Sequence, residues 1–181
     1  MSNSYEYAPN SQLTAAIADG MGGIQNVGDE EELKKYDWQK MISEYINENH
    51  VSFTGGVDVK RIADIENELG VTFPDSYKCF LRNYGSGGLF GVEIVGCDYG
   101  IPPTVVELTK SYREDDMPSD FVIIEDAGEY QYCLQTSKMK DGECPVVNWA
   151  VDEDVIFEAD DFSEFFLSRI CDGEENWKIL K

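Results

Sequence analysis

Apolar residues recur at helical spacing along the first half of the chain. Between residues 37 and 46 they fall at every third or fourth position, which predicts an amphipathic helix capped by its first residue. A second stripe predicts a helix over residues 59–69, and Gly70 follows it where a left-handed residue commonly ends a helix. A third stripe predicts a helix over residues 74–84. Pro74 suits its first position, where a missing N–H costs no hydrogen bond.

The pattern then changes to short runs rich in β-branched and aromatic residues, separated by turn residues. Residues 85–88, Gly-Ser-Gly-Gly, are predicted to form the turn that precedes these runs. Residues 125–129 are typical of a hairpin connection between two of them. The predicted strands cover residues 89–95, 121–125, 130–135, 146–150 and 155–158. Because short turns join neighbouring strands, the sheet is predicted to be mainly antiparallel.

Two further helices interrupt and follow the strands. One is predicted over residues 104–113 with Thr104 as its cap. The other begins after Asp161, which with Glu164 three residues later resembles a capping box, and residues 174–181 are predicted to add a terminal turn. Helices followed mostly by strands and then a helix predict the α+β class, with helices flanking a mainly antiparallel sheet.

The 181 residues suffice for one well-packed domain. Residues 1–36 differ from the remainder because they are polar, rich in glycine and end near an acidic run. We predict a flexible or loosely docked extension over residues 1–36 and a single α+β domain over residues 37–181.

Charge narrows the classes of partner. The chain has 36 acidic and 14 basic residues, a formal net charge of −22. Such a surface repels phosphate backbones and anionic lipids, so direct binding to nucleic acid or membrane is not expected. It attracts basic proteins and accelerates their encounter at low salt. Acidity also serves solubility alone in many proteins, so net charge by itself does not establish a binding role.

The sequence predicts a cytoplasmic protein without metal or cofactor. Its amino terminus lacks the basic start and apolar stretch of a signal peptide, and no apolar run approaches the roughly 18 residues of a membrane span. Five cysteines without a C-x-x-C pair are typical of reduced, mostly buried thiols. His50 is the only histidine, which argues against a zinc site and against a histidine-dependent triad.

Other catalytic patterns are also weak. The glycines of residues 85–88 lack the following G-K-[ST] of a phosphate-binding loop, and residues 152–154 lack the glycine and final glutamate of a calcium loop. Adjacent carboxylates such as Glu125 and Asp126 arise by chance in so acidic a chain. We therefore predict a protein that is not an enzyme.

The segment from Ile62 to Gly85 resembles the SUKH superfamily, which includes bacterial immunity proteins and the fungal Smi/Knr cell-wall regulators. The resemblance lies in an E-x-x-L-G helix end, a hydrophobic-Pro pair that opens the next helix, an aromatic residue within it, a glycine pair after it and a late tryptophan-bearing strand. The residues that match are Glu66, Leu69, Gly70, Phe73, Pro74, Tyr77, Gly87, Gly88 and Trp149. Phe73 stands where leucine is usual. The resemblance spans roughly residues 38–170.

This motif consists of structural residues and contains no reactive group. The resemblance implies an immunity protein that binds and neutralises a cognate protein toxin, often a nuclease, so function is inferred by analogy of fold. The alternative is an intracellular scaffold or regulatory adaptor that uses the same acidic surface.

Acidic clusters in predicted turns are the candidate partner-binding residues, because turns of a sheet can gather on one rim and oppose the cations of a nuclease. The candidates are Asp98, Tyr99, Glu125, Asp126, Glu129, Asp152, Glu153 and Asp154. Exposed aromatic residues near the acids would supply most of the binding energy, and Tyr130, Tyr132 and Trp177 join Tyr99 as candidates. Tyr132 fits a buried position equally well.

Overall fold

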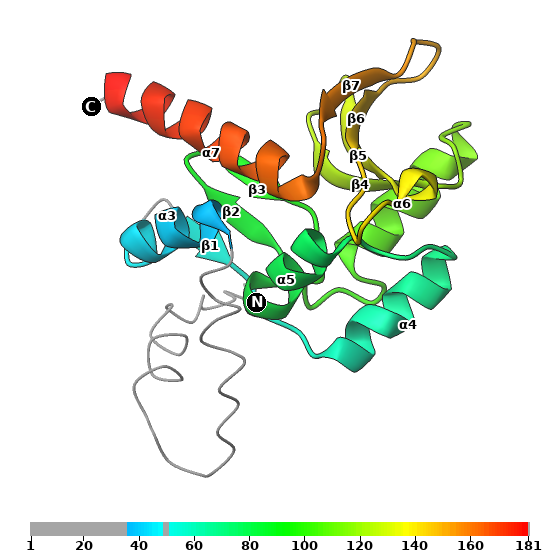
Figure 1. Ribbon diagram of the computed structural model, residues 1–181, viewed down its shortest axis with the longest axis horizontal. Coiled ribbons are helices and arrows are strands. Elements are labelled where there is room, and N and C mark those ends of the chain that lie inside the picture. The colour runs from blue at the N-terminus through cyan, green and yellow to red at the C-terminus, as the bar shows by residue number, and fades with distance from the viewer. Residues whose placement is uncertain (1–35, 49–50, 181) are drawn as a thin grey trace, which may run out of the picture.

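Five α-helices and two antiparallel sheets form the described part of the chain (Figure 1), which is residues 36–48 and 51–180 of a computed structural model. The α+β class is therefore confirmed. In chain order the elements are α3 (Asp37–Tyr45), β1 (Val51–Phe53), α4 (Val59–Leu69), α5 (Asp75–Tyr84), β2 (Gly87–Leu89), β3 (Val92–Ile94), α6 (Thr104–Glu114), β4 (Phe121–Asp126), β5 (Gln131–Gln135), the 3-10 turn η1 (Thr136–Lys138), β6 (Val146–Trp149), β7 (Ile156–Ala159) and α7 (Phe162–Ile179). The predicted extension lies outside the described residues apart from Tyr36, and its separation from the domain stays a prediction.

The glycine pair lies in a strand and not in a turn, so the prediction of a turn over residues 85–88 was wrong for Gly87 and Gly88. Both belong to β2, the middle strand of the three-stranded sheet β1-β2-β3. A Cβ atom on Gly87 would lie 2.0 Å from the carbonyl oxygen of Ser52, and one on Gly88 would lie 2.1 Å from that of Val92. Glycine is required here because the neighbouring backbones approach too closely for any side chain.

Residues 89–95 form a hairpin instead of the single predicted strand. Phe90 and Gly91 both have positive φ values, 56° and 83°, and the chain reverses there between β2 and β3. Two consecutive residues with positive φ are typical of the tightest hairpin turns, which match the twist of the flanking strands. The strand β1 has no counterpart among the predicted elements.

The other strands form a four-stranded sheet in the order β4-β5-β6-β7. Gln131 lies opposite Trp149 in its register, which places the β4–β5 turn and the β6–β7 turn at the same end of the sheet. The two sheets meet where the Val95 amide donates to the Ile124 carbonyl at 2.8 Å. Adjacent residues of a strand point to opposite faces. Gln131 contacts Tyr112 of α6 and Tyr132 contacts Phe165 of α7, so these two helices cover opposite faces.

The helix ends follow local capping chemistry with three corrections. Tyr36 and not Asp37 is the N-cap of α3, and Asp37 is its first helical residue. Gly70 adopts the left-handed conformation after α4 (φ 70°) as predicted. Pro74 is the N-cap of α5 and not its first helical residue, and Thr104 is the first residue of α6 and not its cap. The carboxylate of Asp161 accepts the Glu164 amide at 2.8 Å, so the predicted cap of α7 is confirmed.

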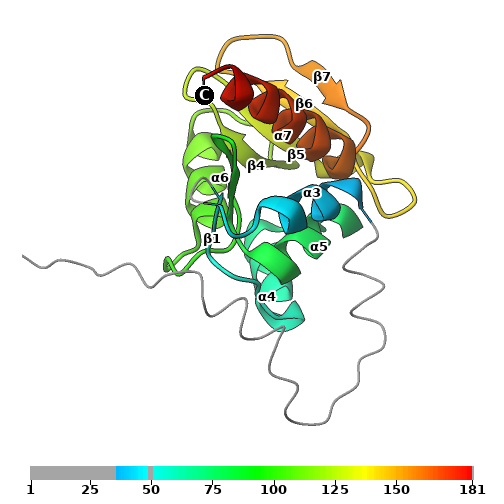
Figure 2. The same cartoon turned by 90° about the vertical axis from the view of Figure 1, so that its left-hand side faces the viewer.

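An aromatic cluster joins the helices into one core. Trp38 of α3 and Phe80 of α5 both pack against Phe162 and Phe166 of α7, and all four side chains are fully buried. Figure 2 shows α7 crossing the four-stranded sheet and reaching over α3. The helix is continuous to Ile179, so residues 174–179 extend α7 and do not form a separate turn.

Candidate partner-binding surface

The two hairpin turns of the four-stranded sheet form an acidic rim, defined here as Asp126, Glu129, Asp152, Glu153 and Asp154. All five residues are exposed. No lysine or arginine occurs in residues 126–130 or 150–158. The shared register of the turns therefore brings together acids that are more than twenty residues apart in sequence. A local positive φ at Asp152 (62°) shapes the second turn, a conformation that aspartate tolerates better than most residues.

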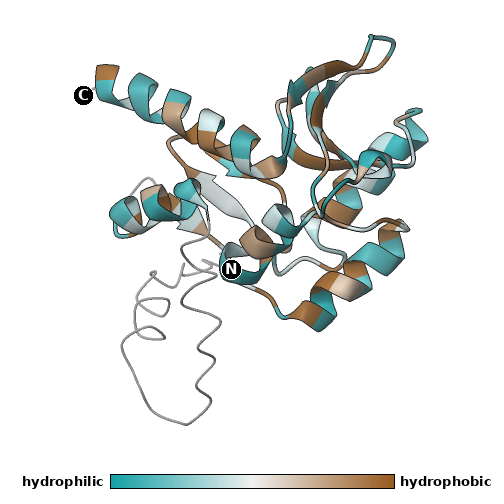
Figure 3. Cartoon of the chain, in the orientation of Figure 1, coloured by the Kyte–Doolittle hydropathy of each residue, from teal (hydrophilic) through white to brown (hydrophobic). Residues whose placement is uncertain are grey.

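Exposed apolar side chains adjoin this rim. The apolar edge consists of Val151, Val155, Ile156 and Phe157, on and just before the edge strand β7. Ile156 and Phe157 remain 57% and 60% exposed. In Figure 3 the hydrophobic colour of β7 meets the hydrophilic tip of the projecting hairpin. Large exposed apolar groups rimmed by polar residues mark interaction sites, and this combination suits a partner that is both basic and partly apolar.

Glu125 does not belong to this surface. The residue is only 6% exposed, and both carboxylate oxygens accept hydrogen bonds from Arg169 of α7. Arg169 also lies over the Tyr132 ring, 5.3 Å from its centre, and the Glu125 hydrogen bond raises the pKa of Arg169. Adjacent residues alternate across the pleat, so Asp126 is exposed whereas Glu125 faces α7. We therefore leave Glu125 out of the partner-binding residues.

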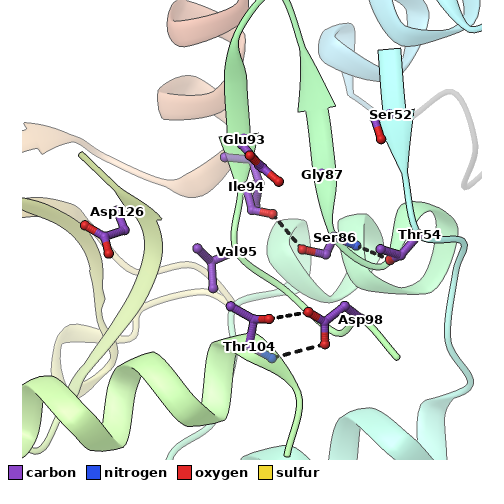
Figure 4. A pocket seen from close by; sticks show the side chains of 10 residues that line it. All are labelled: Ser52, Thr54, Ser86, Gly87, Glu93, Ile94, Val95, Asp98, Thr104 and Asp126. Carbon is purple, nitrogen blue, oxygen red and sulfur yellow. Dashed lines mark hydrogen bonds between the residues drawn. The ribbon is translucent and has the colours of Figure 1, made fainter. Parts of the chain in front are cut away.

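A cleft of about 290 Å³ lies between the two sheets and the start of α6 (Figure 4). Its walls carry hydroxyl groups and three carboxylates, those of Glu93, Asp98 and Asp126. Asp98 accepts hydrogen bonds from the Thr104 amide (3.2 Å), the Thr104 hydroxyl and the Gly100 amide (2.9 Å). Burial alone would raise the pKa of Asp98, but these donors outweigh it and hold the pKa below its ordinary value. Asp98 thus caps α6 and shapes the loop before it.

The aromatic candidates differ in exposure. Tyr99 is 87% exposed and its hydroxyl donates to the Thr54 carbonyl at 2.5 Å. Tyr132 is buried, and Trp177 is partly buried against Phe90. Tyr130 is half-buried at the end of the β4–β5 turn and packs edge-on against Tyr132. Of these four, Tyr130 lies nearest in sequence to the acidic rim, while Tyr99 lies on the loop that borders the cleft.

The residues of the helix-joining motif build one connected corner. Glu66 accepts the Phe73 amide at 2.6 Å and pairs with Lys78 of α5 at 3.0 Å, which fixes the path between α4 and α5. Tyr77 is fully buried, and its hydroxyl donates to the Val95 carbonyl at 2.7 Å. Leu69 and Phe73 are buried beside them, and Trp149 is buried against Tyr112. These contacts hold the two sheets and the helices in their relative positions.

A family comparison agrees with this arrangement. Residues 38–171 match the model of the SMI1-KNR4 cell-wall family, SUKH_5. The chain belongs to this SUKH family. The predicted resemblance is thus confirmed, and the match includes all nine motif residues from Glu66 to Trp149.

This SUKH protein is also similar to the uncharacterized protein YnaB of Bacillus subtilis (strain 168). The two are 35% identical over 85 residues, which is 46% of this chain and 53% of YnaB. The chain therefore spans about half the length of the curated relative that it matches. The similarity supports common ancestry and transfers no activity.

The described residues of this SUKH protein show no cluster of three histidine, cysteine or acidic side chains arranged to hold a metal ion. His50 lies outside the described residues. Within residues 36–48 and 51–180, no helix has both the length and the apolar character needed to cross a bilayer.

The apolar edge was missed at the sequence level. Residues 155–158 were predicted as a strand but not as an exposed one. The signal for their exposure in the sequence is the acidic run of residues 152–154, which immediately precedes the apolar residues 155–157. What the sequence did not reveal is that β7 has a single neighbouring strand within the part of the chain that the structure describes.

Proposed function

We propose that this SUKH protein is an immunity protein that binds a cognate protein toxin in the cytoplasm and neutralises it without catalysis or cofactor. The acidic rim carries the proposal: five exposed carboxylates with no intervening cation adjoin four exposed apolar side chains. A toxin that acts on nucleic acid must present lysine and arginine to phosphates, and the rim offers those cations an alternative partner. Membership of a family that includes immunity proteins supports the same function.

Charge and apolar contact have separate roles in this proposal. The rim carboxylates are solvated, so their attraction mainly accelerates encounter and orients the partner. The apolar edge supplies area that is removed from water, which contributes about 25 cal/mol for each Å² buried. Asp126 lies both on the rim and on the wall of the cleft, so the negative surface continues from the hairpins toward Glu93 and Asp98. Asp98 and Tyr99 therefore stay in the proposed surface as its margin.

The test is co-expression with each protein domain encoded by the genes beside this one, among which we expect a toxin. We expect the protein to restore growth and to form a complex whose association rate falls steeply with salt. Changing residues 152–154 together to lysine is expected to slow association about tenfold or more at low salt, because the steering field is reversed. The fold should remain intact, since all three side chains are exposed and the strain of lysine at the positive φ of Asp152 falls on a surface turn.

A matched control changes Glu44, Glu48 and Asp64 to lysine. These acids are exposed and lie away from the hairpins, Glu44 on α3, Glu48 just after α3 and Asp64 on α4, and the change in net charge is equal. Equal slowing by both triple variants would show that net charge alone steers the partner and would remove the rim from the interface. A non-toxic partner recovered from the native host, with no rescue of growth, would instead favour a scaffold or adaptor.

A further inference from the structure

The outer edge of β7 is unpaired within the described part of the chain. Among residues 36–48 and 51–180, β7 pairs only with β6 and ends the order β4-β5-β6-β7, and residues 155–158 form no other backbone hydrogen bond. Every residue from 151 to 158 is exposed. An exposed strand edge presents unpaired N–H and C=O groups in the spacing that another strand requires.

Both faces of the sheet are uncovered at Ile156 and Phe157, whereas Ala159 at the end of β7 is buried. Ile156 lies opposite Asn148 and Phe157 lies opposite Val147, so their side chains point to the two opposite faces of the sheet. α6 and α7 cover the inner strands, where Trp149 and Tyr132 are buried, but leave Ile156 and Phe157 more than half exposed. An added strand would place side chains beside Ile156 on one face and beside Phe157 on the other, and such cross-strand pairs stabilise a sheet.

Charge selects the kind of neighbour. Glu158 lies within the exposed strand, three acids at residues 152–154 precede it, and the whole chain carries a net charge of −22. A second copy would bring an equal negative charge to this edge, and like charges placed opposite one another destabilise a strand pair. An extended segment that carries lysine or arginine meets complementary charge instead.

We propose that β7 is a docking edge on which an extended, cationic segment of a protein partner adds as the fifth strand of the four-stranded sheet. This inference rests on the proposed binding function and specifies how the partner engages it. The ladder of main-chain hydrogen bonds supplies affinity, while Ile156 and Phe157 contact alternate side chains of the added strand. The irregularity at Glu158, between the pairs of Phe157 and Ala159, limits docking to the segment before it and hinders unselective pairing.

The experiment uses the full chain and two synthetic peptides. One is a capped heptapeptide that alternates lysine and valine, and the other is the same peptide with N-methyl groups on two adjacent central amides, which removes one donor from each edge of its ladder. We expect the first peptide to bind and to slow hydrogen exchange of the amides in residues 154–158. The N-methylated peptide should bind at least about fivefold more weakly through either edge, because one lost hydrogen bond is worth about 1 kcal/mol.

A pair of protein variants checks the role of the side chains. Phe157→Ser is expected to weaken binding of the first peptide, whereas Val59→Ser, which alters an equally exposed apolar residue on α4, is expected to leave it unchanged. Equal binding of the two peptides, protection at another site, or no binding at millimolar peptide would overturn the docking edge. Protection of the same amides that grows with protein concentration alone would identify a second copy as the occupant and would also overturn it.

These results separate the inference from the proposed function. Rescue of growth without peptide binding would leave the immunity role standing and reject strand addition. Strand addition without rescue would leave the docking edge standing and reject the toxin as its partner.

Discussion

Replacing Arg169 with methionine tests whether Glu125 serves the fold or the binding surface. The substitution preserves the length of the apolar stem but removes the guanidinium that donates to both Glu125 oxygens. It leaves a carboxylate whose side chain is 9% exposed without its ion-pair partner. Breaking a buried pair from one side typically costs ~3 kcal/mol or more. The lost contact with the Tyr132 ring adds about 0.5–1 kcal/mol.

The assay is a double-mutant cycle measured by urea denaturation and thermal unfolding. Arg169→Met is expected to lower the free energy of unfolding by ~3 kcal/mol and Tm by about 6–12 °C. Glu125→Gln should cost only about 1–2 kcal/mol, because the Arg169 side chain is 32% exposed and can reach water. The double variant should be more stable than Arg169→Met, since no unpaired charge remains buried. A loss below about 1 kcal/mol for Arg169→Met, or additive losses in the cycle, would refute the structural role assigned to Glu125.

Three other predictions concern local features. Gly87 has φ 111°, and a Cβ added there would lie 2.0 Å from the Ser52 carbonyl oxygen, so Gly87→Ala should destabilise the fold by several kcal/mol or prevent folding. At Gly70 (φ 70°) an added Cβ would meet no atom within 4 Å, so Gly70→Ala should cost only the backbone strain of about 1–2 kcal/mol. Equal losses of the two variants in urea denaturation would contradict this prediction. Burial raises the pKa of Glu143 above its ordinary value, so its protonated form favours folding and its contribution is lost as pH rises through the raised pKa. The unfolding free energy of the wild type minus that of Glu143→Gln should therefore fall as pH rises from the ordinary glutamate pKa through the raised one. A difference that does not change with pH would refute this prediction. Of the five thiols only that of Cys171 is exposed, so a thiol reagent should label one cysteine per native chain. Labelling should be slow at neutral pH, because partial burial and the nearby Glu174 raise the pKa of Cys171. Rapid labelling of several cysteines would contradict this prediction.

Local chemistry explains why much of the fold was predictable. The helix end at Gly70 and the cap at Asp161 depend on residues within four positions, and the hydrophobic stripes identify the helices that they cover. The family motif from Glu66 to Tyr77 is a contiguous segment whose contacts are mostly short-range. Such signals are present in the sequence because their physical causes are local.

Features set by distant contacts were not predictable. Gly87 resembles a turn residue in sequence, and only the approach of β1 makes it a strand residue. Glu125 and Asp126 are adjacent acids, yet Arg169, 44 residues away from Glu125, separates their roles. The exposure of Phe157 depends on the order of strands in the sheet. The gathering of acids on one rim was anticipated, but which acids take part required the register.

The aromatic cluster built on α7 has a consequence for how the chain is made. Trp38 and Phe80 emerge from the ribosome long before Phe162 and Phe166, the rings that cover them. Until those residues are translated, the nascent polypeptide carries uncovered aromatic surface of the kind that chaperones bind. We therefore expect polypeptides that end before α7 to be degraded, and those extended through this helix to accumulate.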